Sequence, residues 1–174
     1  MFAGTPREEK GIFQLCNTIK SSIELYPHDM FYIHTINSPN LAYQLETNFP
    51  KNVITNNNFL SGRPYFDFLM QGDVVLIPYN SETYYLRTSH IFMEALGLGR
   101  AVIVSNNSWM EELLNEFGYP LGSIMTDWTK EALLESIKEL HQKRQEILEN
   151  AYRTAEYIRN THNPEQWVNL ILSP

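Results

Sequence analysis

The stretch "SHIFME" places a hydroxyl group and a carboxylate about one helical turn apart, at Ser89 and Glu94. A serine ahead of an apolar helical pattern is a typical N-cap, and the backbone amides that follow it attract anions. Glu94 lies off the buried stripe that the spacing predicts for Ile91, Ala95 and Leu98, with Phe92 and Leu96 beside it. A carboxylate there can accept hydrogen bonds from two vicinal hydroxyls, such as those of a ribose. The alternative is a solvated glutamate, the ordinary state of a single helix position.

The residues before this helix form a long polar and aromatic loop, from 78 to 90. It is longer than a simple strand-to-helix turn requires. Thr88 or Ser89 can cap the helix, the free amides from Ser89 and His90 onward suit a diphosphate, and Arg87 can neutralise it. The alternative is a surface loop that ends in an N-cap.

A second loop, "GTPREEKG" from Gly4 to Gly11, follows the first predicted strand. Gly4 permits a close backbone approach, and Arg7 and Lys10 supply positive charge where a helix begins. Thr5 can also be read as the start of a capping box with proline at the first helical position, which needs no ligand. The loop has neither the spacing of a dinucleotide fingerprint nor that of a P-loop.

Short apolar runs alternate with helical patterns along the whole chain. The strands are expected at 1–4, 30–36, 52–55, 73–79, 100–105 and 122–126. The helices are expected at 10–25, 40–49, 63–72, 89–98 and 109–117, followed by one long helix from 129 to about 158. The most convincing strand is "DVVLIPY", because a continuous β-branched run is typical of a central parallel strand.

This alternation predicts an α/β fold: a doubly wound, Rossmann-like domain of three layers with a parallel sheet. Residues 1–174 are expected to form a single domain, and 164–174 are expected to be a terminal segment that packs toward another domain. Ligands of such sheets bind beyond the carboxyl ends of the strands. The two loops described above leave strands at that edge.

Composition restricts the function further. A net charge of −7 argues against nucleic acid as a partner, because such proteins carry a basic surface. Cys16 is the only cysteine, which excludes an internal disulfide and favours a reducing, cytoplasmic location. No apolar run approaches the roughly 20 residues of a transmembrane helix, and the first residues lack the layout of a signal peptide.

Three stretches, "EKGIFQL", "DVVLIPY" and "FMEALGLGRAVIVS", occur in an order and spacing that resemble the C-terminal half of GT-B retaining glycosyltransferases. This is the large group 1 family of sucrose and glycogen synthases and of bacterial capsule and lipopolysaccharide transferases. The resemblance covers nearly the whole chain. Its most diagnostic part is "EALGLGRAVIVS", which is similar to the family pattern Glu-Ala-x-x-x-Gly-x-Pro-Val-Val.

The resemblance implies roles for several residues. Two glutamates eight positions apart serve the donor in this family; the second, which binds the ribose, corresponds to Glu94, and the first position holds Leu86. Glu82 lies four residues too early and could replace it only if the loop were rebuilt. The diphosphate-binding lysine corresponds to Lys10, whereas the partner arginine would fall at Thr5 and Arg7 stands two positions along.

By topology alone, the family's nucleobase loop corresponds to residues 57–61, with Asn58 and Phe59 as the candidate contacts. The resemblance implies transfer of a sugar from a nucleotide-diphosphate sugar to a hydroxyl acceptor, a glycan or a lipid-linked glycan, in surface polysaccharide or glycoconjugate synthesis. No metal or other cofactor is expected. The acceptor side belongs to an N-terminal Rossmann domain, so little transfer is expected from this chain alone. The protein would be cytoplasmic, or peripheral at the inner face of the membrane.

The alternative is a catalytically degenerate module that binds a nucleotide or serves as an interaction surface. The glutamate missing at Leu86 favours this second hypothesis.

Overall fold

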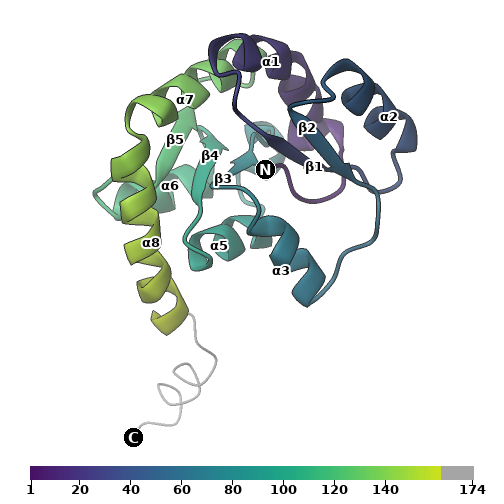
Figure 1. Ribbon diagram of the computed structural model, residues 1–174. Coiled ribbons are helices and arrows are strands. Elements are labelled where there is room, and N and C mark those ends of the chain that lie inside the picture. Colours follow the sequence, from purple (N-terminus) through teal and green to yellow (C-terminus); the bar gives the residue numbers. More distant parts are fainter. Residues whose placement is uncertain (162–174) are drawn as a thin grey trace, which may run out of the picture.

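The computed structural model describes residues 1–161, and the expected terminal segment 164–174 lies outside them. A sheet runs through the middle of the molecule with helices on both faces (Figure 1). The strands are β1 (Phe31–His34), β2 (Val53–Asn56), β3 (Val74–Ile77), β4 (Ala101–Ser105) and β5 (Gly122–Met125). The helices are η1 (Glu8–Lys10), α1 (Ile12–Leu25), α2 (Pro39–Asn48), α3 (Arg63–Leu69), α4 (Ser81–Tyr84), α5 (His90–Gly97), α6 (Trp109–Glu116), α7 (Lys130–Gln142) and α8 (Arg144–Thr161). The three-layer, Rossmann-like prediction is confirmed.

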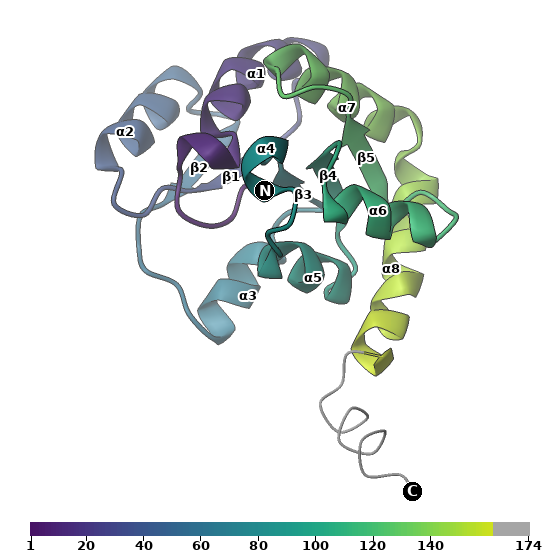
Figure 2. The same cartoon turned by 180° about the vertical axis from the view of Figure 1, so that it is seen from behind.

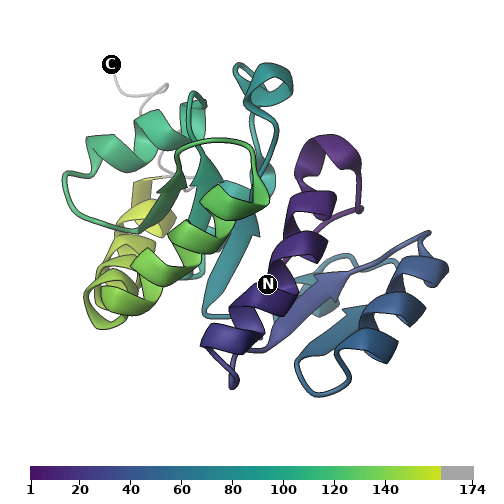
Figure 3. The same ribbon diagram turned by 90° about the horizontal axis from the view of Figure 1, so that it is seen from above.

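The strands form two parallel groups, β2–β1 and β3–β4–β5. The first two residues connect them. Met1 donates to the carbonyl of Val74 at 2.9 Å and accepts from the amide of Leu76 at 2.7 Å. Phe2 pairs with β1 on the other side. In the view from above, α1 runs across the middle of the molecule between the two groups of strands (Figure 3).

The two faces of the sheet carry separate apolar cores, because side chains alternate along each strand. Val75 and Ile77 of β3 lie in the core with α3, α5, α6 and part of α8. Leu76, between them, lies in the core with α1, α2 and α7. β4 alternates in the same way, and all five of its residues are buried. This burial on both faces explains the continuous apolar runs of the sequence.

Four details differ from the sequence-based expectations. The first four residues make a single bridge rather than a strand, because the chain turns at Gly4, whose φ is 95°. The loop from 78 to 90 contains the short helix α4, which Asn80 caps by accepting a hydrogen bond from the amide of Thr83 at 3.0 Å. The bounds of the remaining strands and helices differ from the predictions by a few residues.

The fourth difference is that the long C-terminal helix is two helices, α7 and α8, separated at Lys143. Leu133 and Ile137 of α7 pack on the α1 side of the sheet. Ala151 and Ile158 of α8 pack on the α5 side. A straight helix cannot cover both faces, so the chain bends where it passes the edge of the sheet (Figure 1).

Candidate functional site

The loop 4–11 and the segment after β3 lie against each other at the carboxyl ends of the strands (Figure 2). The amide of Asn80 donates to the carbonyl of Glu9 at 2.8 Å. Gly11 approaches so closely that a β-carbon there would lie 2.1 Å from the carbonyl oxygen of Pro78. That oxygen also accepts a hydrogen bond from the Trp128 indole at 2.8 Å. The loop that carries Arg7 and Lys10 is therefore fixed to the end of the central strand.

The capping-box alternative for this loop is wrong. The helix at Glu8 is a single 3₁₀ turn whose N-cap is Arg7, without a side-chain capping bond. The α-helix begins only after Gly11, which adopts a left-handed conformation with φ 76°. Thr5 is exposed. The loop is shaped by its docking onto Pro78 and Asn80 rather than by capping.

Two tyrosines lie at the centre of the site. Tyr79, directly after β3, and Tyr84, in α4, are both buried, with ring centroids 4.4 Å apart. Arg7 Nη2 donates to the Tyr84 hydroxyl at 3.5 Å, and the Arg87 guanidinium lies 5.9 Å from the centre of the same ring. Two of the predicted cations thus approach Tyr84 from different loops, and Lys10 lies over Tyr79.

The Lys10 ammonium lies 5.6 Å from the centre of the Tyr79 ring. It also lies 3.2 Å from the point where a β-carbon on Gly4 would stand, so the glycine leaves room for it. Burial, and then the positive charge of Arg7, lower the pKa of Lys10. Among residues 1–161 no carboxylate forms an ion pair with it. A half-buried ammonium that repels a neighbouring cation is electrostatically suited to an anion.

Helix α5 begins beside this group of cations. Buried Ser89 is its N-cap and accepts a hydrogen bond from the amide of Phe92 at 3.3 Å, whereas His90 is exposed. A hydrogen bond with Ser89 also opposes the effect of burial, which raises the pKa of Tyr79. The residues that α5 buries fully are Phe92, Ala95 and Leu96. Ile91 and Leu98, which the spacing placed in the buried stripe, are only partly buried.

Glu94 lies one turn further along α5 and is half-buried. The Tyr65 hydroxyl of α3 donates to its Oε2 at 2.6 Å. The charge of Glu94 raises the pKa of Tyr65 and contributes to the raised pKa of Tyr79, in both cases after the larger effect of burial. Glu94 is therefore not a freely solvated surface charge. It belongs to the same group of side chains as Tyr79.

The end of the 78–90 loop is held in place by Trp109, whose indole donates to the carbonyl of Arg87 at 2.6 Å. The Trp109 ring meets Phe92 edge to face, with centroids 5.2 Å apart. Leu86 is 85% exposed, at the position where the resemblance places a glutamate. An apolar side chain thus points into solvent beside the cations.

The structure does not bring the expected nucleobase residues into this group. Phe59 is 79% exposed, and Asn58 contributes its backbone carbonyl, which lies 2.8 Å from Nε2 of buried His34. Asn57 accepts a hydrogen bond from the Thr35 hydroxyl. These contacts anchor the loop to the end of β1, and neither Asn58 nor Phe59 contacts Lys10 or Glu94 through any interaction recorded within residues 1–161.

The structure places Gly4, Arg7, Lys10 and Arg87 around the Tyr79–Tyr84 pair, and Ser89 and Glu94 both interact with Tyr79. Thr5 and His90 are exposed. Sequence reasoning missed the parts played by Tyr65, Tyr79, Tyr84 and Trp109. A tyrosine directly after a buried strand was an available signal for Tyr79. Nothing in the sequence indicated Tyr65, which comes from a separate helix.

Other parts of the described chain offer less chemistry. A cavity of about 350 Å³ lies at the opposite edge of the sheet, lined by Met1, Asp29, His141 and Arg144 among others. A second, of about 400 Å³, lies beside α6 and β5. Within residues 1–161 no three His, Cys, Asp or Glu side chains are grouped as a metal site, and none of the helices is long and apolar enough to cross a membrane.

Several solved structures with a similar fold are glycosyltransferases. The C-terminal domain of a group 1 family glycosyl transferase, LpcC from Francisella tularensis, matches with a TM-score of 0.66 and 16% identity, over 90% of this chain and 83% of that one. A glycosyltransferase from Rickettsia africae matches with a TM-score of 0.64 and 14% identity, over 99% of this chain and 48% of its own. The sucrose-phosphate synthase of Thermosynechococcus elongatus matches with a TM-score of 0.65 and 14% identity, over 99% of this chain and 45% of its own.

No protein-family profile matches the sequence, and a comparison with curated proteins gave no match. The chain spans about half the length of the Rickettsia and Thermosynechococcus proteins. The structural similarity, at these identities, concerns the fold. This chain has the fold of the C-terminal domain of a GT-B glycosyltransferase, as its sequence motifs predicted.

Proposed function

We propose that this chain is the donor-binding domain of a glycosyltransferase and binds a nucleotide-diphosphate sugar. The observation that carries the proposal is the arrangement at the start of α5. Lys10, Arg7 and Arg87 surround the Tyr79–Tyr84 pair, and Glu94 lies one turn beyond the capped first turn of the same helix.

The distribution of charge matches the parts of such a ligand. The cations and the free amides of α5 would stabilise the diphosphate, which becomes the leaving group when the glycosidic bond to the donor breaks. Glu94 would accept hydrogen bonds from the ribose. Lys10, without a carboxylate partner in the described chain, would gain one in the diphosphate.

The reaction we infer transfers the sugar to a hydroxyl acceptor, a glycan or lipid-linked glycan, during synthesis of surface polysaccharide or glycoconjugates. An N-terminal Rossmann domain would supply the acceptor side and close over the exposed margin at Thr5 and Leu86. No cofactor enters this scheme. A cytoplasmic protein, peripheral at the inner face of the membrane where the acceptor is lipid-linked, is consistent with it.

Exposed Leu86 favours a second candidate function. A donor site that lacks the first family glutamate could be a nucleotide-binding or interaction module without transfer activity. The two functions differ in what they do with the sugar. A donor site binds the nucleoside diphosphate with and without its sugar, whereas a module without donor function has no room reserved for the sugar.

The test is isothermal titration calorimetry with UDP, GDP and ADP, then with the sugar nucleotides of whichever base binds. Lys10→Gln should weaken binding about tenfold or more, because a charge-assisted contact to phosphate is lost. Lys20→Gln, at an exposed position of α1, is the matched control and should bind like the unmodified chain. The proposal fails if the folded chain binds none of the three, or if the two lysine variants behave alike.

A further inference from the structure

Tyr84 interacts with two arginines that come from segments far apart in the sequence. Arg7, in the loop from 4 to 11, donates from Nη2 to the Tyr84 hydroxyl oxygen at 3.5 Å. The Arg87 guanidinium lies 5.9 Å from the centre of the Tyr84 ring, within the range of a cation–π interaction. Burial raises the pKa of Tyr84 against the opposing effect of Arg7, so the phenol is neutral at physiological pH. A neutral side chain thus binds two cations and cancels the charge of neither.

The Tyr84 side chain is fixed independently of these arginines. It is 7% exposed, and its ring packs on that of Tyr79 with centroids 4.4 Å apart. Its amide donates to the carbonyl of Asn80 at 2.9 Å within α4. The amide of Asn80 donates in turn to the carbonyl of Glu9 at 2.8 Å. The short helix α4 therefore places the phenol and is also joined to the loop that carries Arg7.

The two arginine side chains have few other contacts, and both are exposed. Arg7 forms an ion pair through Nε with Glu9 at 3.2 Å. Arg87 forms no ion pair recorded within residues 1–161. Exposed arginine side chains lose rotamer freedom when they bind a ligand, so a residue that orders them beforehand lowers the cost of binding.

We infer that Tyr84 is a positioning residue, which holds the guanidinium groups of Arg7 and Arg87 so that both bind one anionic group, the diphosphate of the ligand. This inference rests on the proposed function. An acidic side chain that brought the two cations together would neutralise the charge that attracts the ligand. A phenol instead supplies an acceptor oxygen and an aromatic face without a negative charge. Tyr84 acts through the two arginines and needs no contact with the ligand itself.

The experiment is a double-mutant cycle, in which calorimetry measures the affinity of the full chain for the nucleoside diphosphate that binds. Tyr84→Phe removes the hydroxyl and keeps the ring, so it should weaken binding about threefold to tenfold. In an Arg7→Met chain the same change should alter the affinity by less than about twofold, because the hydroxyl then has no guanidinium to hold. A tyrosine with a merely structural role would cause the same loss in both chains.

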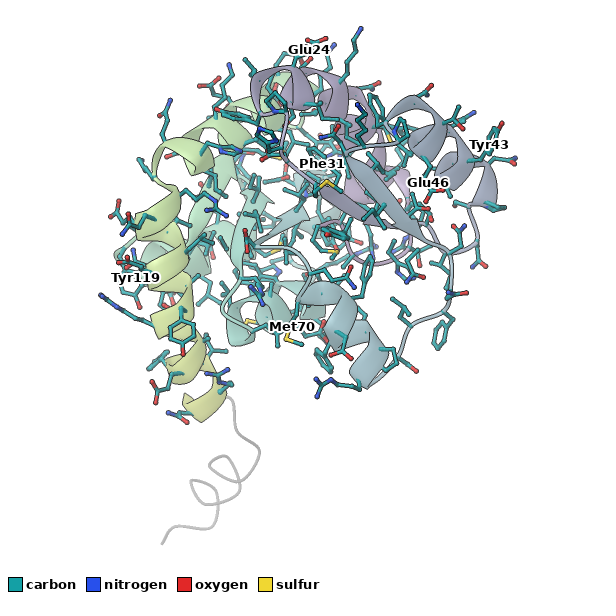
Figure 4. All side chains as sticks on the ribbon, in the orientation of Figure 1. Glu24, Phe31, Tyr43, Glu46, Met70 and Tyr119 are labelled. Carbon is teal, nitrogen blue, oxygen red and sulfur yellow. The ribbon has the colours of Figure 1, made fainter. Side chains whose placement is uncertain are left out.

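The aromatic face is tested through Arg87. Tyr84→Leu removes both the hydroxyl and the ring, so it should weaken binding further than Tyr84→Phe, and this additional loss should disappear in an Arg87→Met chain. Tyr43→Phe is the control, because Tyr43 points outward from α2 and is 73% exposed (Figure 4). It should bind like the unmodified chain. Circular dichroism verifies that each variant is folded, and Tyr84→Phe alone decides the inference if Tyr84→Leu does not fold.

Two results would overturn the inference and leave the proposed function in place. One is unchanged nucleotide affinity in folded Tyr84→Phe. The other is an equal loss from this change in the unmodified and the Arg7→Met chains. If no nucleoside diphosphate binds to the folded chain, the proposed function fails and this inference fails with it.

Discussion

Replacing Gly11 by alanine should destabilise the protein through a specific clash, because this glycine joins the cation-bearing loop to the central strand. Its φ of 76° is a left-handed conformation, and a β-carbon would stand 2.1 Å from the Pro78 carbonyl oxygen. The conformation alone costs a non-glycine residue about 1–2 kcal/mol. The oxygen cannot move away freely, because it accepts the Trp128 indole at 2.8 Å. Relieving the overlap adds about 1–3 kcal/mol.

Gly118 provides the control for the part of the cost that comes from the left-handed backbone conformation alone. Its φ is 70°, and a β-carbon there would meet no atom within 4 Å. Gly118→Ala should therefore lower the free energy of unfolding by the strain alone, about 1–2 kcal/mol. Gly11→Ala should lower it by about 2–5 kcal/mol, the sum of strain and overlap.

The assay is urea unfolding, monitored by circular dichroism. The slope of the free energy of unfolding against urea concentration should be the same for the two variants and the unmodified chain, which verifies that all three unfold in the same way. The expected difference between the two variants is about 1–3 kcal/mol. The explanation of the loop's position is refuted if the two variants lose the same free energy of unfolding.

Three further predictions concern other parts of the molecule. Burial raises the pKa of the Cys16 thiol to about 11. Labelling of the folded chain by a maleimide should therefore be slow at pH 8 and should accelerate as the pH approaches 11, whereas labelling in urea should be fast. Equal labelling rates in the folded and unfolded chains would contradict this prediction. Trp109→Phe keeps an aromatic ring against Phe92 but loses the indole hydrogen bond to the Arg87 carbonyl. The free energy of unfolding should therefore fall by about 1 kcal/mol, and amide hydrogen exchange in the 85–88 loop should become faster. Unchanged exchange would refute the anchoring role of Trp109. Arg7→Gln should reduce the salt dependence of nucleotide binding, measured from 50 to about 200 mM salt, and an unchanged slope would place this arginine outside the anion site.

The strands and most helices could be predicted because their signals are local. The run from Val74 to Ile77 is buried on both faces and is therefore continuously apolar. The sequence from Glu94 to Ser105 contains a helix end, a glycine turn at Gly99 and a buried strand within a few residues. Such patterns depend only on residues that are close in the chain, so a single sequence is enough to recognise them.

The bend at Lys143 could not be predicted in this way. The apolar residues keep helical spacing from Leu133 to Ile158, and nothing local interrupts it. The helix breaks because its two halves cover opposite faces of the sheet, which is a property of the assembled layers.

The same distinction between local and long-range signals applies to the candidate site. Lys10 and Ser89 were candidates because strand-to-helix loops lie at the ligand-binding edge of such a sheet, and Glu94 was one because it lies off the apolar stripe of the next helix and matches a family motif. The partner of Glu94 could not be predicted, because Tyr65 lies 29 positions away on another helix. The expected nucleobase contacts at Asn58 and Phe59 rested on topology alone, and no interaction recorded within residues 1–161 connects them with the group around Glu94.

The measurement that tests the central claim most directly is calorimetric titration of this chain and of Glu94→Ala with UDP, GDP and ADP. The account predicts that one nucleotide binds and that the variant binds it about 1–3 kcal/mol more weakly while its circular dichroism is unchanged. Glu112→Ala, at an exposed position of α6, should bind like the unmodified chain. Equal affinity of the folded Glu94→Ala variant and the unmodified chain would contradict the assignment of this carboxylate to the ribose.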